Sequence, residues 1–337
     1  MKSPFTGGEA ILNKEKREMT VRKEKVEVVY HFYKCIDSGE QFTTDELDNI
    51  NTLQAYNAYR SRMALPFPDE IKEIRKRYGI SAAKMSGILG FGANVYRNYE
   101  TGEIPNQSNA RLMQMAQDPE KFKELVQISG IHKRVDSGKL LKHIEGIIEG
   151  TILKPYRLTS SLRDYFFGTS PVNIFSGYKK NSLEKFTAMV IFFSARLEPW
   201  KTKLNKLLFY ADFLHFKKTC FSISGLNYRA IEMGPVPNNF NTIFDYLENA
   251  DLIKISRTEF LNGGIGEQFK PHPATVFNPT LFNDAEMQSL NEIITKLGKT
   301  STEEIINLSH HEKAWQENYE AGRKMISYES SFDLKAV

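Results

Sequence analysis

The chain has 337 residues, of which 41% are hydrophobic and 12% aromatic, so it has enough apolar material for two or three domains and is not intrinsically disordered. Its net charge of +4 is mildly basic, which permits a nucleic-acid partner without indicating one. Cys35 and Cys220 lie far apart in the sequence and do not suggest a disulfide framework, and no apolar run approaches the roughly 20 residues that span a membrane. We therefore predict a cytoplasmic protein without membrane contact.

Residues 1–64 are predicted to form a small β unit followed by a helix. Side-chain types alternate along residues 21–28, which is typical of a strand, and the aromatic residues 30–33 continue the strand. The helix is expected over about residues 44–64. Two prolines within residues 65–68 mark the domain boundary, because proline cannot sit inside a helix.

Residues 65–128 are predicted to form four or five short helices in a helix-turn-helix pattern. The first helix covers residues 69–78, with Asp69 as its cap, and Ser81 caps the second. A glycine-rich turn leads to a third helix over residues 93–99. This order is typical of a domain that binds DNA with two successive helices.

The third helix of this pattern is expected to lie in the major groove of DNA. Asparagine and arginine suit base reading because each can form two hydrogen bonds, to adenine and guanine respectively. Serine and lysine at the start of the second helix suit phosphate contacts. The alternative is an ordinary solvated helix face. The predicted DNA-binding residues are Ser81, Lys84, Asn94, Arg97 and Asn98.

Residues 81–115 resemble the helix-turn-helix of MqsA-type antitoxins, within the Xre-like class. The shared features are a second helix of small residues, Gly-x-Gly-x-Asn ending at Asn94, and Tyr-Glu-x-Gly beginning at Tyr99. The resemblance implies base reading by Asn94. That family has arginine at the position of Asn98, whereas Arg97 is displaced by about 100° around the helix, so the operator sequence does not carry over. We expect the unit to bind a palindromic operator as a homodimer.

The same family begins with a zinc-binding unit that carries two Cys-x-x-Cys pairs. This chain keeps the residues around both pairs, but Ser3, Thr6 and Ser38 occupy the positions of three of the four cysteines. Neutral hydroxyls are poor zinc ligands, and Cys35 with Asp37 cannot complete a tetrahedral site. We predict that no metal or other cofactor binds and that an aromatic core holds this unit together.

Residues 129–180 are predicted to form a linker with some helix, and residues 181–337 a second globular unit. The linker helix is expected over residues 139–149, with a break at Pro155. Irregular chain is expected over residues 225–237, and a later Gly-Gly turn predicts a β-hairpin. The helices predicted in the second unit span residues 182–197, 202–217, 239–249, 283–297, 301–309 and 312–319.

Two segments of the second unit resemble the Panacea, or SocA-like, antitoxin domain. Residues 203–212 read Lys-Leu-Asn-Lys-Leu-Leu-Phe-Tyr-Ala-Asp, and residues 228–237 read Tyr-Arg-Ala-Ile-Glu-Met-Gly-Pro-Val-Pro. The resemblance implies a domain that neutralises a protein toxin by direct binding. An alternative is that the polar residues form a buried structural network around a Gly-Pro turn. The residues expected to bind the partner are Lys203, Lys206, Tyr210, Asp212, His215, Tyr228, Arg229 and Glu232.

No sequence motif predicts an enzyme. Two adjacent histidines at residues 310–311 lack the spacing that places two zinc ligands on one helical face, and no Gly-Lys-Ser/Thr phosphate signature occurs. A hydrolytic role for Asp212 and His215 is the weakest hypothesis, because no nucleophile is evident beside them. The expected fold is mainly α with small β elements (α+β): an N-terminal β unit, a helical Xre-like domain and a mostly helical C-terminal domain with a β-hairpin.

These patterns predict an antitoxin of a type II toxin–antitoxin system. The C-terminal domain would neutralise a cognate, co-encoded protein toxin, and the helix-turn-helix would bind operator DNA and repress the protein's own operon. The alternative is a transcription regulator whose C-terminal domain senses another protein or a ligand.

Overall fold

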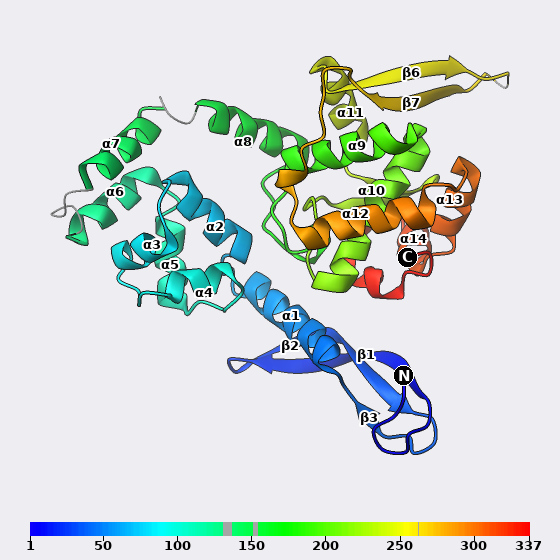
Figure 1. The fold of residues 1–337 in the computed structure, drawn as a ribbon, viewed down its shortest axis with the longest axis horizontal. Coiled ribbons are helices and arrows are strands. Elements are labelled where there is room, and N and C mark those ends of the chain that lie inside the picture. Colours follow the sequence, from blue (N-terminus) through cyan, green and yellow to red (C-terminus); the bar gives the residue numbers. More distant parts are fainter. Residues whose placement is uncertain (131–136, 151–153, 262) are drawn as a thin grey trace. The chain divides into compact units, whose positions relative to one another are not determined.

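The computed structural model shows a mostly helical α+β fold, which confirms the predicted fold class (Figure 1). No helix in the described part of the chain is long and apolar enough to cross a membrane. Parts of the predicted linker, at residues 131–136 and 151–153, lie outside the described residues. The structure describes residues 1–130, 137–150, 154–261 and 263–337.

The chain forms two compact units, and four of the described elements contribute residues to both of them. These shared elements are β1 (Ala10–Val21), β2 (Glu24–Cys35), α1 (Asp45–Arg62) and α8 (Lys154–Phe167). The first unit comprises residues 1–16, 29–53 and 162–337, and the second comprises residues 17–28 and 54–161.

The N-terminal β unit is a sheet whose strands follow chain order: β1 (Ala10–Val21), β2 (Glu24–Cys35) and β3 (Gln41–Phe42). Arg22 and Lys23 form the turn between β1 and β2, with φ angles of 47° and 75°. Positive φ at both central residues is what a type I′ hairpin turn requires. The continuous strand predicted over residues 21–28 is therefore wrong, because the chain reverses at Arg22 and Lys23.

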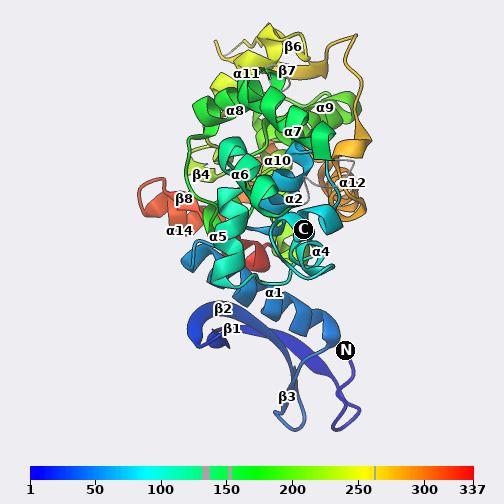
Figure 2. The ribbon, with the colours of Figure 1, turned by 90° about the vertical axis from the view of Figure 1, so that its left-hand side faces the viewer.

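Helix α1 (Asp45–Arg62) follows the sheet and confirms the helix predicted over residues 44–64 (Figure 2). Within the first unit, the buried amide of Asn51 ties this helix to β2. It accepts the backbone N–H of His31 at 2.8 Å and donates to the carbonyl of His31 at 2.9 Å. The rings of His31 and Phe332 lie 4.6 Å apart, so β2 also packs against the C-terminal residues of the same unit.

The two segments that resemble zinc-binding pairs have matching backbone geometry. The N–H of Gly7 donates to the carbonyl of Ser3 at 3.0 Å, and the N–H of Gly39 donates to the carbonyl of Cys35 at the same distance. The φ angles of the two glycines are 76° and 75°. The hydroxyl of Thr6 lies 3.3 Å from the sulfur of Cys35, so the two turns face each other.

The side chains that meet between these turns do not fit a zinc ion. Cys35 supplies one thiol, and hydrogen bonds from Ser3, Ser38 and Thr6 lower the pKa of that thiol to about 6. A zinc site needs thiolate, imidazole or carboxylate ligands rather than neutral hydroxyls. Within the described residues, no group of three or more His, Cys, Asp and Glu could hold a metal. The absence of a metal remains a prediction.

The second unit contains the predicted helix-turn-helix segment. Pro68 begins its first helix, and the carboxylate of Glu70 accepts the N–H of Phe67 at 2.9 Å. Asp69 therefore lies inside the first turn, and its prediction as the cap is wrong. Ser81 caps the next helix as predicted, accepting a backbone N–H at 3.2 Å. The helices of this segment are α2 (Pro68–Arg77), α3 (Ala82–Ile88), α4 (Val95–Glu100), α5 (Gln107–Met115) and α6 (Pro119–Ile128).

Part of the predicted linker completes the core of the second unit. Helix α7 (Ser137–Ile148) packs on α6 and buries Ile144 and Ile147 in the cluster that holds Tyr78. The next helix, α8 (Lys154–Phe167), includes Pro155. The break predicted at Pro155 is wrong, because this proline occupies the first turn of α8, where no N–H is needed.

The C-terminal domain in the first unit is built around α10 (Lys201–Thr219). Every side chain from residue 203 to residue 216 is buried, because other elements of the domain pack on all sides of this helix (Figure 1). The elements that pack around it are α9 (Leu183–Leu197), α12 (Asp284–Leu297), α13 (Thr302–His310), the strands β5 (Gly234–Pro237) and β7 (Ile265–Pro271), and η4 (Tyr328–Asp333). The remaining elements are η2 (Ile174–Ser176), β4 (Tyr228–Ile231), α11 (Phe240–Asn249), β6 (Ile253–Glu259), η3 (Pro279–Leu281), α14 (Lys313–Glu320) and β8 (Met325–Ile326).

A small antiparallel sheet covers one side of α10, with β4 between β5 and β8. The irregular chain predicted over residues 225–237 is therefore wrong over both strands. Pro235 and Pro237 lie in β5, an edge strand, which does not need every N–H for pairing. The predicted β-hairpin is confirmed as β6 and β7.

Candidate functional site

Helix α4 carries the expected base-reading residues on the face away from its buried side. Tyr96 and Tyr99 are buried, and the Tyr96 hydroxyl donates to the carbonyl of Ile71 in α2 at 2.7 Å. Arg75 of α2 binds both carboxylate oxygens of Glu100 at 2.5 and 3.1 Å. These contacts fix α4 against α2, so the exposed face of α4 is presented by a rigid scaffold.

The residues predicted to contact DNA lie on α3 and α4 or directly before them, where Ser81 precedes α3 and Asn94 precedes α4. Asn94, Arg97 and Asn98 are exposed, and none of these side chains has a hydrogen-bond or ion-pair partner within the described residues. Their spacing of three and four residues places them on one face of α4. Ser81 is exposed while its hydroxyl caps α3, and Lys84 in the first turn of α3 is half-buried.

Asp212, in the centre of α10, organises the loop that precedes β4. Its carboxylate accepts the N–H of Ile223 at 2.7 Å and the N–H of Ser224 at 2.8 Å. It also accepts the hydroxyls of Ser224 at 2.5 Å and Tyr228 at 2.8 Å. Burial raises the pKa of Asp212, and these hydrogen bonds oppose the shift. The four donors occupy the carboxylate completely and give it a structural role.

Two buried lysines of α10 bind backbone carbonyls of neighbouring elements. Lys203 donates to the carbonyls of Gly298 and Thr300 at 2.8 and 2.5 Å, beyond the end of α12. Lys206 donates to the carbonyl of Pro235 in β5 at 3.1 Å. Burial lowers the pKa of both amines, and it lowers that of Lys206 to about 7.

Tyr210 contacts a buried carboxylate that holds the C-terminal residues. Its hydroxyl donates to Glu312 at 3.4 Å, and burial raises the pKa of Tyr210 well above its ordinary value. The carboxylate of Glu312 also accepts the backbone N–H groups of Lys335 at 2.9 Å and Ala336 at 3.0 Å. This part of α10 therefore anchors the end of the chain.

His215 forms a polar contact with α12. Its Nδ1 atom lies 3.1 Å from the hydroxyl of Ser289, which donates its own proton to the carbonyl of Ala285 at 3.0 Å. The hydroxyl therefore accepts from Nδ1, so Nδ1 carries the proton of the neutral ring. Burial lowers the pKa of His215 to about 4, so the ring is neutral at physiological pH.

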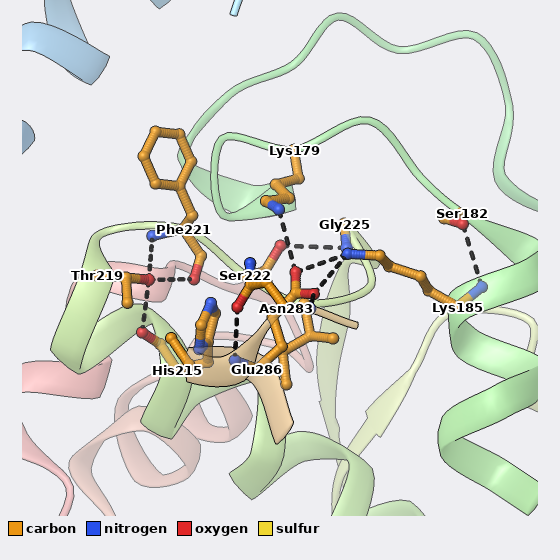
Figure 3. Close-up of polar contacts among 12 residues, drawn as sticks. Lys179, Ser182, Lys185, His215, Thr219, Phe221, Ser222, Gly225, Asn283 and Glu286 are labelled. Carbon is orange, nitrogen blue, oxygen red and sulfur yellow. Dashed lines mark hydrogen bonds and ion pairs between the residues drawn. The ribbon is translucent and has the colours of Figure 1, made fainter. Parts of the chain in front are cut away.

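Glu286 lies beside His215 and binds two lysines from outside α10 (Figure 3). Lys185 contacts its carboxylate at 2.6 and 2.8 Å, and Lys179 contacts it at 3.2 Å. Burial acts to raise the pKa of Glu286, but the two ammonium groups outweigh it and lower the pKa. Glu286 also accepts the N–H of Asn283 at 3.0 Å, so the ion pairs and the helix cap share one carboxylate.

Only Arg229 and Glu232, of the eight residues expected to bind a partner, are exposed. The structure does not bring these two side chains into the buried network. This placement favours the alternative of a structural network for the other six. The six buried residues are Lys203, Lys206, Tyr210, Asp212, His215 and Tyr228.

Several residues of the network were not identified from the sequence: Lys179, Lys185, Ser224, Glu286 and Glu312. Glu286 had a local signal, because Asn-x-x-Glu at the start of a predicted helix is typical of a capping box. That signal places a carboxylate at a helix start, but it does not show that the carboxylate is buried. The other residues had no local signal, because their partners lie far away in the sequence.

No curated protein sequence matches the chain. The matching family model covers α10 from Leu204 onward and the adjoining strands β4 and β5. It is described as antitoxin SocA-like, Panacea domain, and it matches residues 204–316, which supports the Panacea resemblance of the C-terminal domain.

Proposed function

We propose that the protein is a non-enzymatic antitoxin of a type II toxin–antitoxin pair. Its C-terminal domain binds and neutralises a co-encoded protein toxin, and α3 and α4 bind operator DNA to repress the operon as a homodimer. The observation that carries the proposal is the Panacea family match over residues 204–316. Lys203, Lys206, Asp212 and His215 of α10 are occupied by structural hydrogen bonds, which argues against a catalytic role for them.

Co-expression tests neutralisation directly. Each open reading frame beside this gene is induced alone and together with the full chain, and colony counts are compared. We expect one neighbour to stop growth alone and the full chain to restore it. Harmlessness of every neighbour would refute the antitoxin proposal. The full chain is used because residues 1–16 and 29–53 form one compact unit with the C-terminal domain.

Binding to the promoter region tests the role of α4. Asn94→Ala and Arg97→Ala should each weaken operator binding by about 1–3 kcal/mol, because each removes a base-reading side chain. Both side chains are exposed, so the fold and toxin neutralisation should be unchanged. The exposed Lys121 of α6 provides a control, since Lys121→Ala also removes a positive charge. Equal binding of operator and unrelated DNA by the wild type would contradict sequence-specific repression.

The second candidate function is a transcription regulator that senses a ligand through the C-terminal domain. A pocket of about 260 Å³ beside β4 and β5 favours it, because a small molecule could occupy such a space. Promoter binding without any toxic neighbour would support this alternative over the antitoxin.

A further inference from the structure

The small sheet of the C-terminal domain has one buried face and one open face. In β4, Tyr228 and Ala230 are fully buried against the core, whereas Arg229 between them is exposed. The antiparallel register pairs Arg229 with Val236 on one side and with Met325 on the other. Side chains paired in this way project from the same face. Arg229 is therefore central to the open face.

The open face continues into the pocket of about 260 Å³. Its walls combine apolar side chains, among them Phe166, Phe240, Val236 and Pro237, with polar ones, and Arg229 lines the same space. Asn239 donates to the carbonyl of Phe166 at 2.7 Å, which holds the end of α8 at the rim. A pocket with both apolar groups and a cationic group is suited to a ligand that has both characters.

The charge of Arg229 is uncompensated in this structure. The guanidinium has no ion pair or hydrogen bond within the described residues, and no acidic residue lines the pocket. Neutral amides, including those of Asn227 and Asn238, supply the other polar groups. Arginine next to apolar walls binds a carboxylate strongly, because it can form two parallel hydrogen bonds where water is partly excluded.

The rim of the open face contains two exposed methionines. Met233 in the β4–β5 turn is 48% exposed, and Met325 in β8 is 38% exposed. Methionine and arginine are enriched at protein interfaces, and flexible thioether side chains adapt to different partner shapes. This composition favours a protein partner over a small molecule for this face.

We propose that the Arg229 face, defined as Arg229, Met233, Met325 and the adjoining pocket, is the toxin-docking surface. It binds an acidic side chain of the toxin at Arg229 and an adjacent apolar side chain in the pocket. This inference rests on the proposed antitoxin function and names the contact surface of that function.

The buried network supports this surface from beneath. Tyr228 is held by Asp212, and the β5 carbonyl of Pro235 is held by Lys206. The indole N–H of Trp315 donates to the carbonyl of Ile231 at 2.8 Å. These contacts make the buried residues positioning residues for the sheet, while Arg229 makes the contact.

Charge reversal on the full chain tests the docking surface. The probe is the purified toxic product of the neighbouring gene, and its Kd is measured by calorimetry together with rescue of growth. Arg229→Glu should weaken binding at least tenfold and abolish rescue, with an unchanged melting temperature because the side chain is exposed. Lys254→Glu is the matched control: this exposed β6 lysine does not line the pocket, so its Kd should stay within twofold of wild type.

The outcomes separate this inference from the proposed function. If the wild type and Arg229→Glu both neutralise the toxin with equal Kd, the docking surface is overturned while the antitoxin function stands. If the wild type binds no neighbouring gene product, both fall. Compensation gives a second readout: an Asp→Arg or Glu→Arg variant of the toxin should restore binding to Arg229→Glu. If Arg229→Glu lowers the Kd for the toxin, the assigned charge of the partner is wrong.

Discussion

The buried amine of Lys206 makes a specific prediction about stability. This side chain is fully buried, and the carbonyl of Pro235 is its hydrogen-bond acceptor within the described residues. A charged amine with so little compensation opposes folding, since desolvation disfavours the ammonium form. Replacement by an apolar side chain of similar length, Lys206→Met, should therefore stabilise the C-terminal domain near neutral pH.

The magnitude follows from the shifted pKa of Lys206. A decrease from 10.5 to about 7 corresponds to a cost of at most about 4.8 kcal/mol, at about 1.36 kcal/mol per pH unit. Loss of the hydrogen bond to Pro235 offsets about 1 kcal/mol of this cost. Between pH 7 and 10.5 the unfolded chain binds the proton and the folded chain does not, so wild-type stability rises with pH relative to the variant. The advantage of Lys206→Met should therefore shrink by about 2.7 kcal/mol between pH 7.5 and 9.5.

Urea unfolding followed by tryptophan fluorescence measures this difference. Both tryptophans, Trp200 and Trp315, belong to the unit that contains Lys206, so the signal reports that unit. Lys254→Met provides an exposed-lysine control, and its difference from wild type should not vary with pH. A difference between wild type and Lys206→Met that stays constant from pH 7.5 to 9.5 would show that the amine stays charged in the fold, which would refute the reasoning.

Three further changes test other parts of the structure. The pKa of His215 is about 4 in the folded chain and 6.5 for an ordinary histidine, so the free energy of unfolding of the wild type should fall by up to about 3 kcal/mol between pH 6.5 and pH 4. Urea titrations should show a smaller loss for His215→Gln. Asp212→Ala should destabilise by about 2–4 kcal/mol, because several buried donors lose their acceptor; calorimetry that shows an unchanged melting temperature would contradict this. The triple variant Ser3→Cys, Thr6→Cys and Ser38→Cys should bind one Co²⁺ with thiolate charge-transfer absorption, while wild type shows none.

Local sequence signals identified the short helices within residues 65–128 well. Ser81 caps α3 as its position predicts, because a cap is a contact between residues close in sequence. Asp69 was an equally good local candidate, but Pro68 starts the helix one residue earlier and Glu70 satisfies the N–H of Phe67. The error is a single residue in register, which local propensity does not resolve.

The strands of the sheets were harder to predict, because their turns and edges do not follow the common pattern. Arg22 and Lys23 adopt positive φ without glycine or asparagine, so the hairpin turn had no sequence marker. Pro235 and Pro237 indicated irregular chain, but they lie in β5, an edge strand. Whether a strand lies at an edge depends on the whole sheet, so residues 225–237 alone cannot show it.

The sequence predicted which polar residues belong to the candidate site, but not which of them are buried. Polar residues at 203, 206, 212 and 215 were expected to bind a partner, with a buried structural network as the alternative. Helix α10 has no solvent face over residues 203–216, and these four side chains are satisfied by elements from distant parts of the sequence. That information lies in the tertiary packing, whereas Arg229 in the short β4 strand is exposed and stays a predicted partner-binding residue.

Four buried polar residues of α10 each bind a different part of the surrounding structure. Lys203 binds the chain after α12, Lys206 binds β5, Asp212 binds the loop before β4, and His215 binds α12. Apolar packing on a fully buried helix is not directional, so these hydrogen bonds are what select one arrangement of the surrounding elements. Substitutions beneath the sheet should therefore change stability while leaving the toxin contacts intact, whereas Arg229→Glu should change recognition without changing stability. A variant such as Lys206→Met that gained stability but lost neutralisation would show that the network itself moves when the partner binds.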